Sequence, residues 1–434
     1  MNKAICIAVL TFLVCGQGQI VMSKSVQAQT TEARASEADW RYNLGIRAIR
    51  DSQYQKAIEF TLMSLDICRE IKDRECEARA HNGLGLAYSD LGQYGKALDS
   101  YLQRLIIARE IKDRHGEGIT LANLASTYLL LGKYDKAMEF YLQSLAIKRE
   151  TKDRLGEGRS LGNLGIAYHS LGKYDKAIEF HLLSLSIFRE NKDRRGEGIA
   201  LANLGIAYDS LGKYDKAIDF HLQYLAIARE IKDRQGEGIA LGNIGASYDS
   251  LGKYDKAIDF HLQYLAIAQE IKNRQGEGVS LNNLGDSFKN LKQSELAILF
   301  YKQSINVREA IRKDIRKLDK DIQQSYLGTI SSSYKHLADL LIKQDRIMEA
   351  LQVLDLLKVQ ELEDYLKNIK GSDRSAQGVK ILEPEKAISN KLLAVSFDNS
   401  KDLNSELANQ IQQLPTANSD QTRHKKSKLE ASPN

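Results

Sequence analysis

The sequence predicts an all-α solenoid built from stacked helical hairpins. Its strongest feature is an internal repeat, because residues 211–238 recur almost letter for letter at 251–278, a period of 40 residues. A period of this length is typical of arrays in which each unit is a small group of helices. Each unit also holds two apolar stripes with helical spacing, one on either side of a glycine. Only three prolines occur in 434 residues, which argues against a linker-rich chain.

Within one unit, the spacing of Leu204 and Tyr208 along one stripe predicts a first helix over about 201–211. Gly212 follows as a residue that ends a helix and tolerates positive φ. A second stripe predicts a longer helix over about 214–228. The unit is therefore a helical hairpin.

Small residues are expected to bring the two helices of a hairpin close together. Gly205 lies on the first helix and Ala217 on the second, and larger residues such as Tyr208 fill the flanking space. The alanine recurs in phase along the chain, at Ala57, Ala97, Ala137, Ala177, Ala217, Ala257 and Ala297. This recurrence predicts seven hairpins of the same design over residues 29–310.

The segment 232–238 joins one hairpin to the next. Asp233 is a predicted helix N-cap, and Glu237 lies where the helix dipole favours negative charge. The same aspartate recurs at Asp113, Asp153 and Asp193. Two glycines in the segment indicate a tight turn or a close approach between repeats. The recurrent Lys-Asp-Arg and Lys-Tyr-Asp-Lys groups predict a solvated outer face with i,i+4 charge pairs.

The last part of the repeat region departs from the 40-residue period. An eighth copy fits Leu337, Leu341 and Ala350 with an offset of 53 residues. The extra residues, around 312–324, are expected to lengthen the helices there. Residues 311–370 are thus predicted to form a diverged eighth hairpin or capping helices.

Together these residues resemble the tetratricopeptide repeat (TPR) in its longer, kinesin-light-chain form. The resemblance rests on Asn-Leu-Gly, a tyrosine four residues after the leucine, and Leu-Gly-x-Tyr-x-x-Ala, and it covers about residues 37–370. Ala48 replaces the aromatic residue of the first helix in the first copy. The resemblance implies a right-handed superhelix of about eight hairpins, whose first helices line a concave groove.

The residue before the leucine of each Leu-Gly pair is a candidate for binding a partner in that groove. It is Asn43, Asn123, Asn163, Asn203, Asn243 and Asn283, with Gly83 as the exception. An amide both donates and accepts hydrogen bonds, and in related arrays such an asparagine ladder holds a peptide backbone. The alternative is that these asparagines bond neighbouring helices. Further groove candidates by helical position are Ile199, Ile206, Asp209 and Asp249.

The histidines His181, His221 and His261 recur in phase on the second helix. The same position holds Tyr101 and Tyr141 in other copies, so a buried filler of the seam explains the position better than a metal or catalytic role. The predicted partner is a protein or peptide. Self-association of near-identical repeats remains a second option.

Charge argues against a nucleic-acid partner. The formal net charge is +5, and it falls to about +3 without Lys3 and Lys24. Neither value approaches the concentrated positive charge of a nucleic-acid-binding surface.

The N-terminus predicts export. Lys3 is followed by an apolar run over 4–15 and by the small-residue site Val26-Gln27-Ala28, the order of a secretory signal peptide over residues 1–28. An uncleaved membrane anchor is the alternative, although a bilayer span needs roughly 20 apolar residues. The expected location is periplasmic or extracellular, with no membrane span after the signal is removed.

Cys68 and Cys76 are the two cysteines of the predicted mature chain. They fall near the end of one helix and the start of the next, so either a disulfide or two free thiols is compatible with the spacing. No Cys-x-x-Cys spacing occurs, and no metal site is expected.

No enzyme is predicted, because no nucleophile elbow, P-loop or His-Glu-x-x-His motif occurs, and no cofactor is implied. Residues 350–362 resemble the stretch that precedes a caspase-like CHAT peptidase domain in bacterial, especially cyanobacterial, repeat proteins. Only His424 and no cysteine follow Ala350, so the chain resembles the repeat region alone. An adaptor or regulator of a separate CHAT peptidase is the alternative function. Residues 371–434 are expected to be a polar, largely disordered tail.

Overall fold

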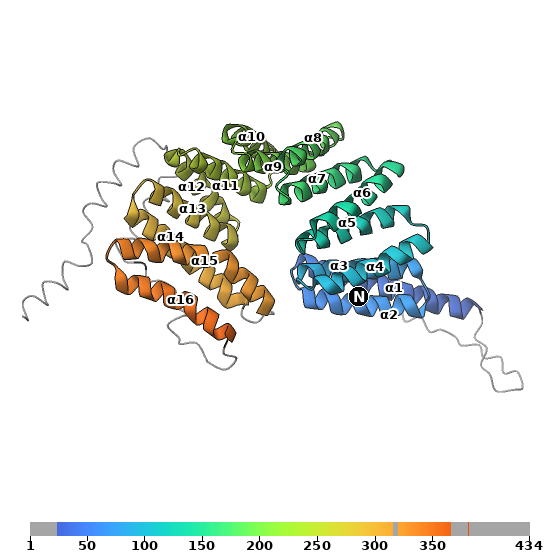
Figure 1. The fold of residues 1–434 in the computed structure, drawn as a ribbon. Helices are drawn as coiled ribbons and strands as arrows, with labels where there is room; N and C mark the ends of the chain where they lie inside the picture. Colours follow the sequence, from blue (N-terminus) through green and yellow to red (C-terminus); the bar gives the residue numbers. More distant parts are fainter. Residues whose placement is uncertain (1–23, 316–319, 366–380, 382–434) are drawn as a thin grey trace, which may run out of the picture. The chain divides into compact units, whose positions relative to one another are not determined.

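The structure is a computed structural model that describes residues 24–315, 320–365 and 381 (Figure 1). These residues form sixteen α-helices and no strand. Helices α1–α6 pair in chain order into three hairpins, and α9–α16 pair into four, which confirms an all-α class of repeated helix pairs. We number the repeats one to eight, with α7 and α8 as the fourth repeat by sequence phase, and call the odd-numbered helices A helices and the even-numbered ones B helices.

The helices are α1 (Lys24–Arg50), α2 (Tyr54–Glu70), α3 (Arg74–Asp90), α4 (Tyr94–Glu110), α5 (Arg114–Leu130), α6 (Tyr134–Glu150), α7 (Arg154–Ser170), α8 (Tyr174–Glu190), α9 (Arg194–Ser210), α10 (Tyr214–Glu230), α11 (Arg234–Ser250), α12 (Tyr254–Glu270), α13 (Arg274–Asn290), α14 (Ser294–Ile315), α15 (Lys320–Lys343) and α16 (Ile347–Tyr365).

The chain divides into two compact units. Residues 1–171 hold α1–α7, and residues 172–434 hold α8–α16. Within each unit, every helix packs against the next one along the chain, as the ribbon shows (Figure 1). Stability in such an array comes from each hairpin and from its contacts with its immediate neighbours.

Glycine and aspartate end and begin the helices as predicted. Gly212, between α9 and α10, has φ of 70°, a conformation that glycine adopts without strain. At the next joint the side chain of Asp233 accepts a hydrogen bond from the N–H of Gly236 at 2.9 Å. The prediction that the second helix of a hairpin is longer than the first was wrong, because α9 and α10 both span 17 residues. The A helix begins directly after its N-cap and includes the glycines of the joint.

Those joint glycines allow a close approach rather than a turn. A Cβ atom on Gly236 would lie 2.6 Å from its own N-cap, Asp233, and 2.9 Å from the hydroxyl of Tyr224 in the preceding repeat. A Cβ atom on Gly238 would lie 3.1 Å from the ring of Tyr264 in the same repeat. The positive φ of the joint belongs to Lys232, at 56°. Of the two explanations offered by the sequence, the close approach is the one that the structure shows.

The seam within repeat five follows the prediction. Ala217 is fully buried, and a Cβ atom on Gly205 would overlap the ring of His221. The ring of Tyr208 stacks on Phe220 with 5.3 Å between centroids. Small residues thus bring the helices close while aromatic residues fill the flanks.

The Lys-Asp-Arg and Lys-Tyr-Asp-Lys groups are largely solvated, as predicted, but the arginines of the joints do not form i,i+4 pairs. Glu237 is buried and accepts hydrogen bonds from Arg229 (2.7 Å) and Arg234, and Arg234 also pairs with Glu270. These links run from α10 to α11 to α12, because stacking brings the start of one A helix beside the ends of two B helices. Equivalent pairs are Arg69–Glu77, Arg74–Glu110, Arg109–Glu117, Arg114–Glu150, Arg149–Glu157, Arg189–Glu197 and Arg194–Glu230.

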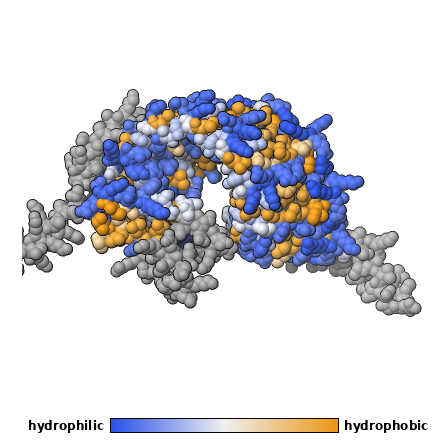
Figure 2. All heavy atoms as spheres, viewed as in Figure 1, coloured by the Kyte–Doolittle hydropathy of each residue, from blue (hydrophilic) through white to orange (hydrophobic). Residues whose placement is uncertain are grey.

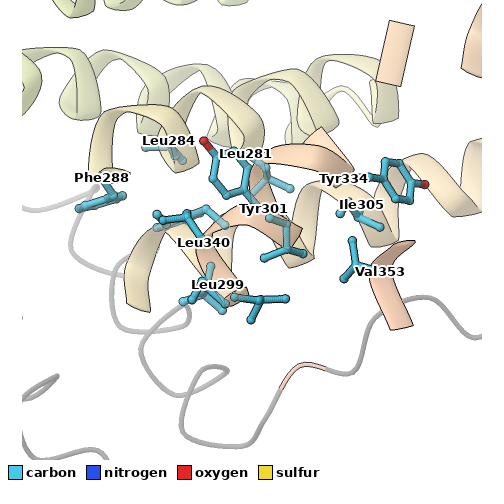
Figure 3. Packing of buried hydrophobic residues seen from close by; sticks show 14 of the residues in the cluster. Leu281, Leu284, Phe288, Leu299, Tyr301, Ile305, Tyr334, Leu340 and Val353 are labelled. Carbon is cyan, nitrogen blue, oxygen red and sulfur yellow. The ribbon is translucent and has the colours of Figure 1, made fainter. Parts of the chain in front are cut away.

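The C-terminal repeats share one large apolar cluster, whose members Leu284, Tyr301 and Tyr334 lie buried between helices (Figure 3). α14 has 22 residues and α15 has 24, against 17 in the regular repeats, which confirms the predicted lengthening. Ile381 packs against this cluster and is partly buried. The rest of the predicted tail, 371–434, lies outside the described residues.

The predicted signal peptide, 1–28, is described only from Lys24, where α1 begins. Among the residues that the structure describes, no helix is both long and apolar enough to cross a membrane.

Candidate peptide-binding face

All six asparagines of the predicted ladder lie on A helices. Asn43 is exposed and the others are half-buried. Only Asn123 bonds a neighbouring helix, since its Nδ2 donates to Oδ1 of Asn82 at 3.1 Å. The side chains of the other five make no hydrogen bond within the described ranges, and they are Asn43, Asn163, Asn203, Asn243 and Asn283. Their amides therefore keep both donors and acceptors for a partner.

Apolar side chains lie on the same helices of the second unit. Ile199 and Ile206 of α9 are 53% and 40% exposed, and Ile239 of α11 is 41% exposed. Ile206 is three residues after Asn203, so the two share one helix face. Hydrophobic residues also interrupt the mostly hydrophilic surface elsewhere (Figure 2). The face around Asn203 therefore combines unused amides with exposed aliphatic side chains.

Asp209 and Asp249, also predicted for the groove, hold repeats together. Oδ2 of Asp209 lies 3.2 Å from Nε2 of His221 on its own B helix, and Oδ1 accepts from Oγ of Ser247 on the next A helix at 2.8 Å. Asp249 does the same with His261 (2.9 Å) and Ser287 (2.7 Å). About a quarter of each aspartate side chain stays exposed. The two carboxylates thus link successive hairpins while one edge faces solvent.

The in-phase histidines fill the seam, as expected. His221 and His261 are fully buried, and each ring occupies the space that a side chain on Gly205 or Gly245 would need. The described part of the chain holds no group of three or more His, Cys, Asp or Glu side chains that could bind a metal ion. The serines that complete these Asp–His pairs were missed because they lie 38 residues away in the sequence.

The basic side chains Lys289, His169 and Arg159 lie on A helices. Nζ of Lys289 pairs with Asp286 at 3.2 Å. Burial lowers the pKa of His169, which favours its neutral form at pH 7. Arg159 is exposed.

A disulfide joins Cys68 at the end of α2 to Cys76 at the start of α3, with 5.5 Å between their Cα atoms. Both cysteines are buried in a small cluster with Ala38. The corresponding joint of repeats four and five pairs Phe188 with Gly196, whose Cβ would overlap the phenylalanine ring. The cysteine pair therefore occupies a place that the joint of repeats four and five fills with a phenylalanine and a glycine.

The TPR family profile matches residues 36–110, 101–150, 151–230 and 233–310, which is more than half of the chain. The chain therefore belongs to the tetratricopeptide-repeat family, a class of repeat scaffold that is typical of protein–protein interaction and generally non-catalytic.

A solved structure agrees with this fold. The apo form of RapI is 20% identical with a TM-score of 0.52, over 64% of this chain and 99% of that one, and this likeness shows the fold alone. The chain is also similar to BtubC (BKLC) from P. vanneervenii, at 21% identity and a TM-score of 0.43, over 56% of this chain and 92% of that one. The comparison with curated proteins gave no match.

Proposed function

We propose that the protein is a non-enzymatic scaffold that holds an extended segment of a partner protein along the exposed face of its A helices. The observation that supports this most is the set of five ladder asparagines whose amides make no hydrogen bond within the described residues. An extended peptide presents N–H and C=O groups that such amides can pair with. The interaction would not depend on the peptide's side chains, so one scaffold would accept several sequences.

The neighbouring isoleucines supply a second contribution. Ile199, Ile206 and Ile239 expose apolar surface beside the amides, and removing that surface from water favours association. Backbone pairing would set the position of the ligand, and apolar contact would add affinity. Asp209 and Asp249 would contribute less, because both are already bonded between repeats.

The face that binds can be located by photo-crosslinking. Peptides would be selected from a random displayed library on residues 29–434, and a photoreactive amino acid would then replace Ile206 on an A helix or Leu222 on a B helix. The two positions are similarly exposed, at 40% and 43%. We expect the selected peptides to crosslink through position 206 and not through 222. Crosslinking through 222 alone, or a library that yields no binder, would refute the proposal.

We also propose that the chain is exported, from the order of the first 28 residues. Sequencing the N-terminus of the protein purified from its native host should give a start at about Gln29. A start at Met1 in the membrane fraction would instead support the uncleaved anchor.

A further inference from the structure

Arg104 of α4 is an exception among the repeats. The in-phase residues of the other regular repeats are Ser64, Ser144, Ser184, Tyr224, Tyr264 and Ser304. Three of these serines donate a hydrogen bond to a carbonyl oxygen of their own A helix at 2.7–2.8 Å. A serine therefore suffices for packing at this position, and the guanidinium of Arg104 calls for another explanation.

The side chain of Arg104 reaches the asparagines of two A helices. Its Nη1 donates to Oδ1 of Asn82 on α3 at 2.5 Å. The same oxygen accepts from Nδ2 of Asn123 on α5 at 3.1 Å. Repeats two and three thus bring one guanidinium and two amides together on the ladder side of the A helices.

This cation has no carboxylate partner in the described ranges, although it is half-buried. Other buried cations of the chain are neutralised, since Lys148 pairs with Asp153 (2.9 Å) and Lys302 with Glu349 (2.8 Å). Burial lowers the pKa of Arg104, and Asp113 opposes this shift only from beyond ion-pair distance. A charge that is partly withdrawn from water without a counter-ion is unfavourable, so an anion bound there would be stabilised.

The free donors of the cluster fit an anion. Nε and Nη2 of Arg104 make no hydrogen bond within the described residues, and neither is enclosed away from solvent. Asn82 uses only its oxygen, so its NH2 group is also unpaired there. A guanidinium presents two parallel N–H groups that match the two oxygens of a carboxylate, and one positive charge balances one carboxylate rather than a doubly charged phosphate.

We propose that Arg104, Asn82 and Asn123 form a recognition site for an aspartate or glutamate side chain of the bound segment. The site gives a side-chain preference to a face that otherwise pairs with the peptide backbone. It rests on the proposed function, because the segment must lie along the A helices to present its carboxylate to Arg104.

The test uses peptides selected on the wild-type chain, each compared with a version in which Asp and Glu are replaced by Asn and Gln. Arg104→Ser introduces the residue that four other repeats carry, so it should fold, and its melting temperature checks this. We expect Arg104→Ser to weaken the acidic peptides by at least about tenfold and the amide versions by less than about twofold. Arg104→Lys should give an intermediate loss of affinity for the acidic peptides, because lysine keeps the positive charge but lacks the two parallel N–H groups of the guanidinium.

Arg79→Gln is the matched control, because Arg79 is a neighbouring A-helix arginine already paired with Asp39 at 2.7 Å. It should change the affinity by less than about twofold. Equal losses for the acidic and amide versions, or none with Arg104→Ser, would overturn the carboxylate site. If Asn203→Ala with Asn243→Ala still weakens the same peptides, the proposed function stands without the site. If neither variant has an effect, both proposals fail.

Discussion

Repeats five and six and the C-terminal end of the same unit use different contacts between successive hairpins. In repeats five and six, Glu237 and its two arginines link three helices, and most exposed residues of the B helices are polar. In repeat seven, α14 is buried at every residue from Leu296 to Lys302. The interior joints therefore rely on polar links and small residues, and the end of the array relies on apolar burial.

Two sequence differences account for much of this contrast. Leu296 and Leu299 stand where repeat six has Lys256 and Asp259. Both leucines belong to the cluster that also contains Leu262, which is 3% exposed. Its counterpart Leu222 in repeat five is 43% exposed. Leu262 and Leu222 are equivalent residues of two repeats of the same design. Their exposure differs because different side chains of the following repeat lie beside them.

The largest expected effect comes from removing a leucine of the C-terminal cluster. Leu299→Ala should destabilise repeats seven and eight by about 2–5 kcal/mol, because a buried side chain leaves a cavity. Leu222→Ala is the control and should cost no more than about 0.5 kcal/mol, since its side chain is already exposed. Hydrogen exchange measures both variants, at the α14 and α15 amides for Leu299→Ala and at the α10 amides for Leu222→Ala. Similar losses in the two variants would mean that the end is not held by apolar burial.

The next effect concerns the seam of repeat five. Gly205→Ala should cost about 1–3 kcal/mol, because the added methyl group overlaps the buried ring of His221. Repeat three carries Ala125 at this position beside Tyr141. The control Ala125→Gly should cost only about 0.5–1 kcal/mol, from helix propensity. Thermal unfolding followed by circular dichroism measures both, and a neutral Gly205→Ala would contradict the close seam.

Loss of a polar link should have a comparable or smaller effect. Glu237→Ala removes the acceptor of Arg229 and Arg234 and should cost about 1–3 kcal/mol. Arg229→Gln should cost no more than about 1 kcal/mol, because repeat six has Gln269 there and it still donates to Glu277 at 3.0 Å. Melting temperatures at low and high salt measure this. A larger loss for Arg229→Gln than for Glu237→Ala would contradict the importance of the buried acceptor.

The last test changes the pH and leaves the sequence unchanged. Burial opposes ionisation of Glu349, but hydrogen bonds from Arg346 and Lys302 outweigh it and lower its pKa to about 2. The unfolded chain takes up this proton near the ordinary value of 4.5. Stability of repeats seven and eight should therefore fall as the pH drops from about 4.5 towards 2. Glu349→Gln should flatten this slope, and an unchanged slope would show that other carboxylates cause it.

Features that depend on neighbouring residues in the sequence were predictable. Gly212 and Asp233 act on the backbone within a few residues, so helix ends and the hairpin count followed from the sequence. The length of the A helix was underestimated, because its first residues include two glycines that tertiary contacts tolerate.

Contacts between repeats were not predictable in the same way. Ser247 bonds Asp209 from 38 residues away, and Arg234 bonds Glu270 from 36 residues away. Such pairs appear only once the stacking of hairpins is known. One signal was present: the near-identical runs differ only at Arg229/Gln269 and Asp233/Asn273, and both substitutes keep the hydrogen bonds of the joint. For the asparagines, the phase was predictable from the sequence, but the lack of partners for most of their amides in the described residues was not.

The most direct test of the central claim is the affinity of two selected peptides of unrelated sequence for the double variant Asn203→Ala with Asn243→Ala. Gln223→Ala with Gln263→Ala removes two exposed amides from the B helices of the same repeats and is the control. We predict that both peptides lose affinity for the asparagine variant by at least about tenfold, at about 1 kcal/mol or more per lost hydrogen bond. Helicity, melting temperature and the glutamine control should stay unchanged. Unaltered affinity in a folded asparagine variant, or an equal loss in the control, would contradict the account.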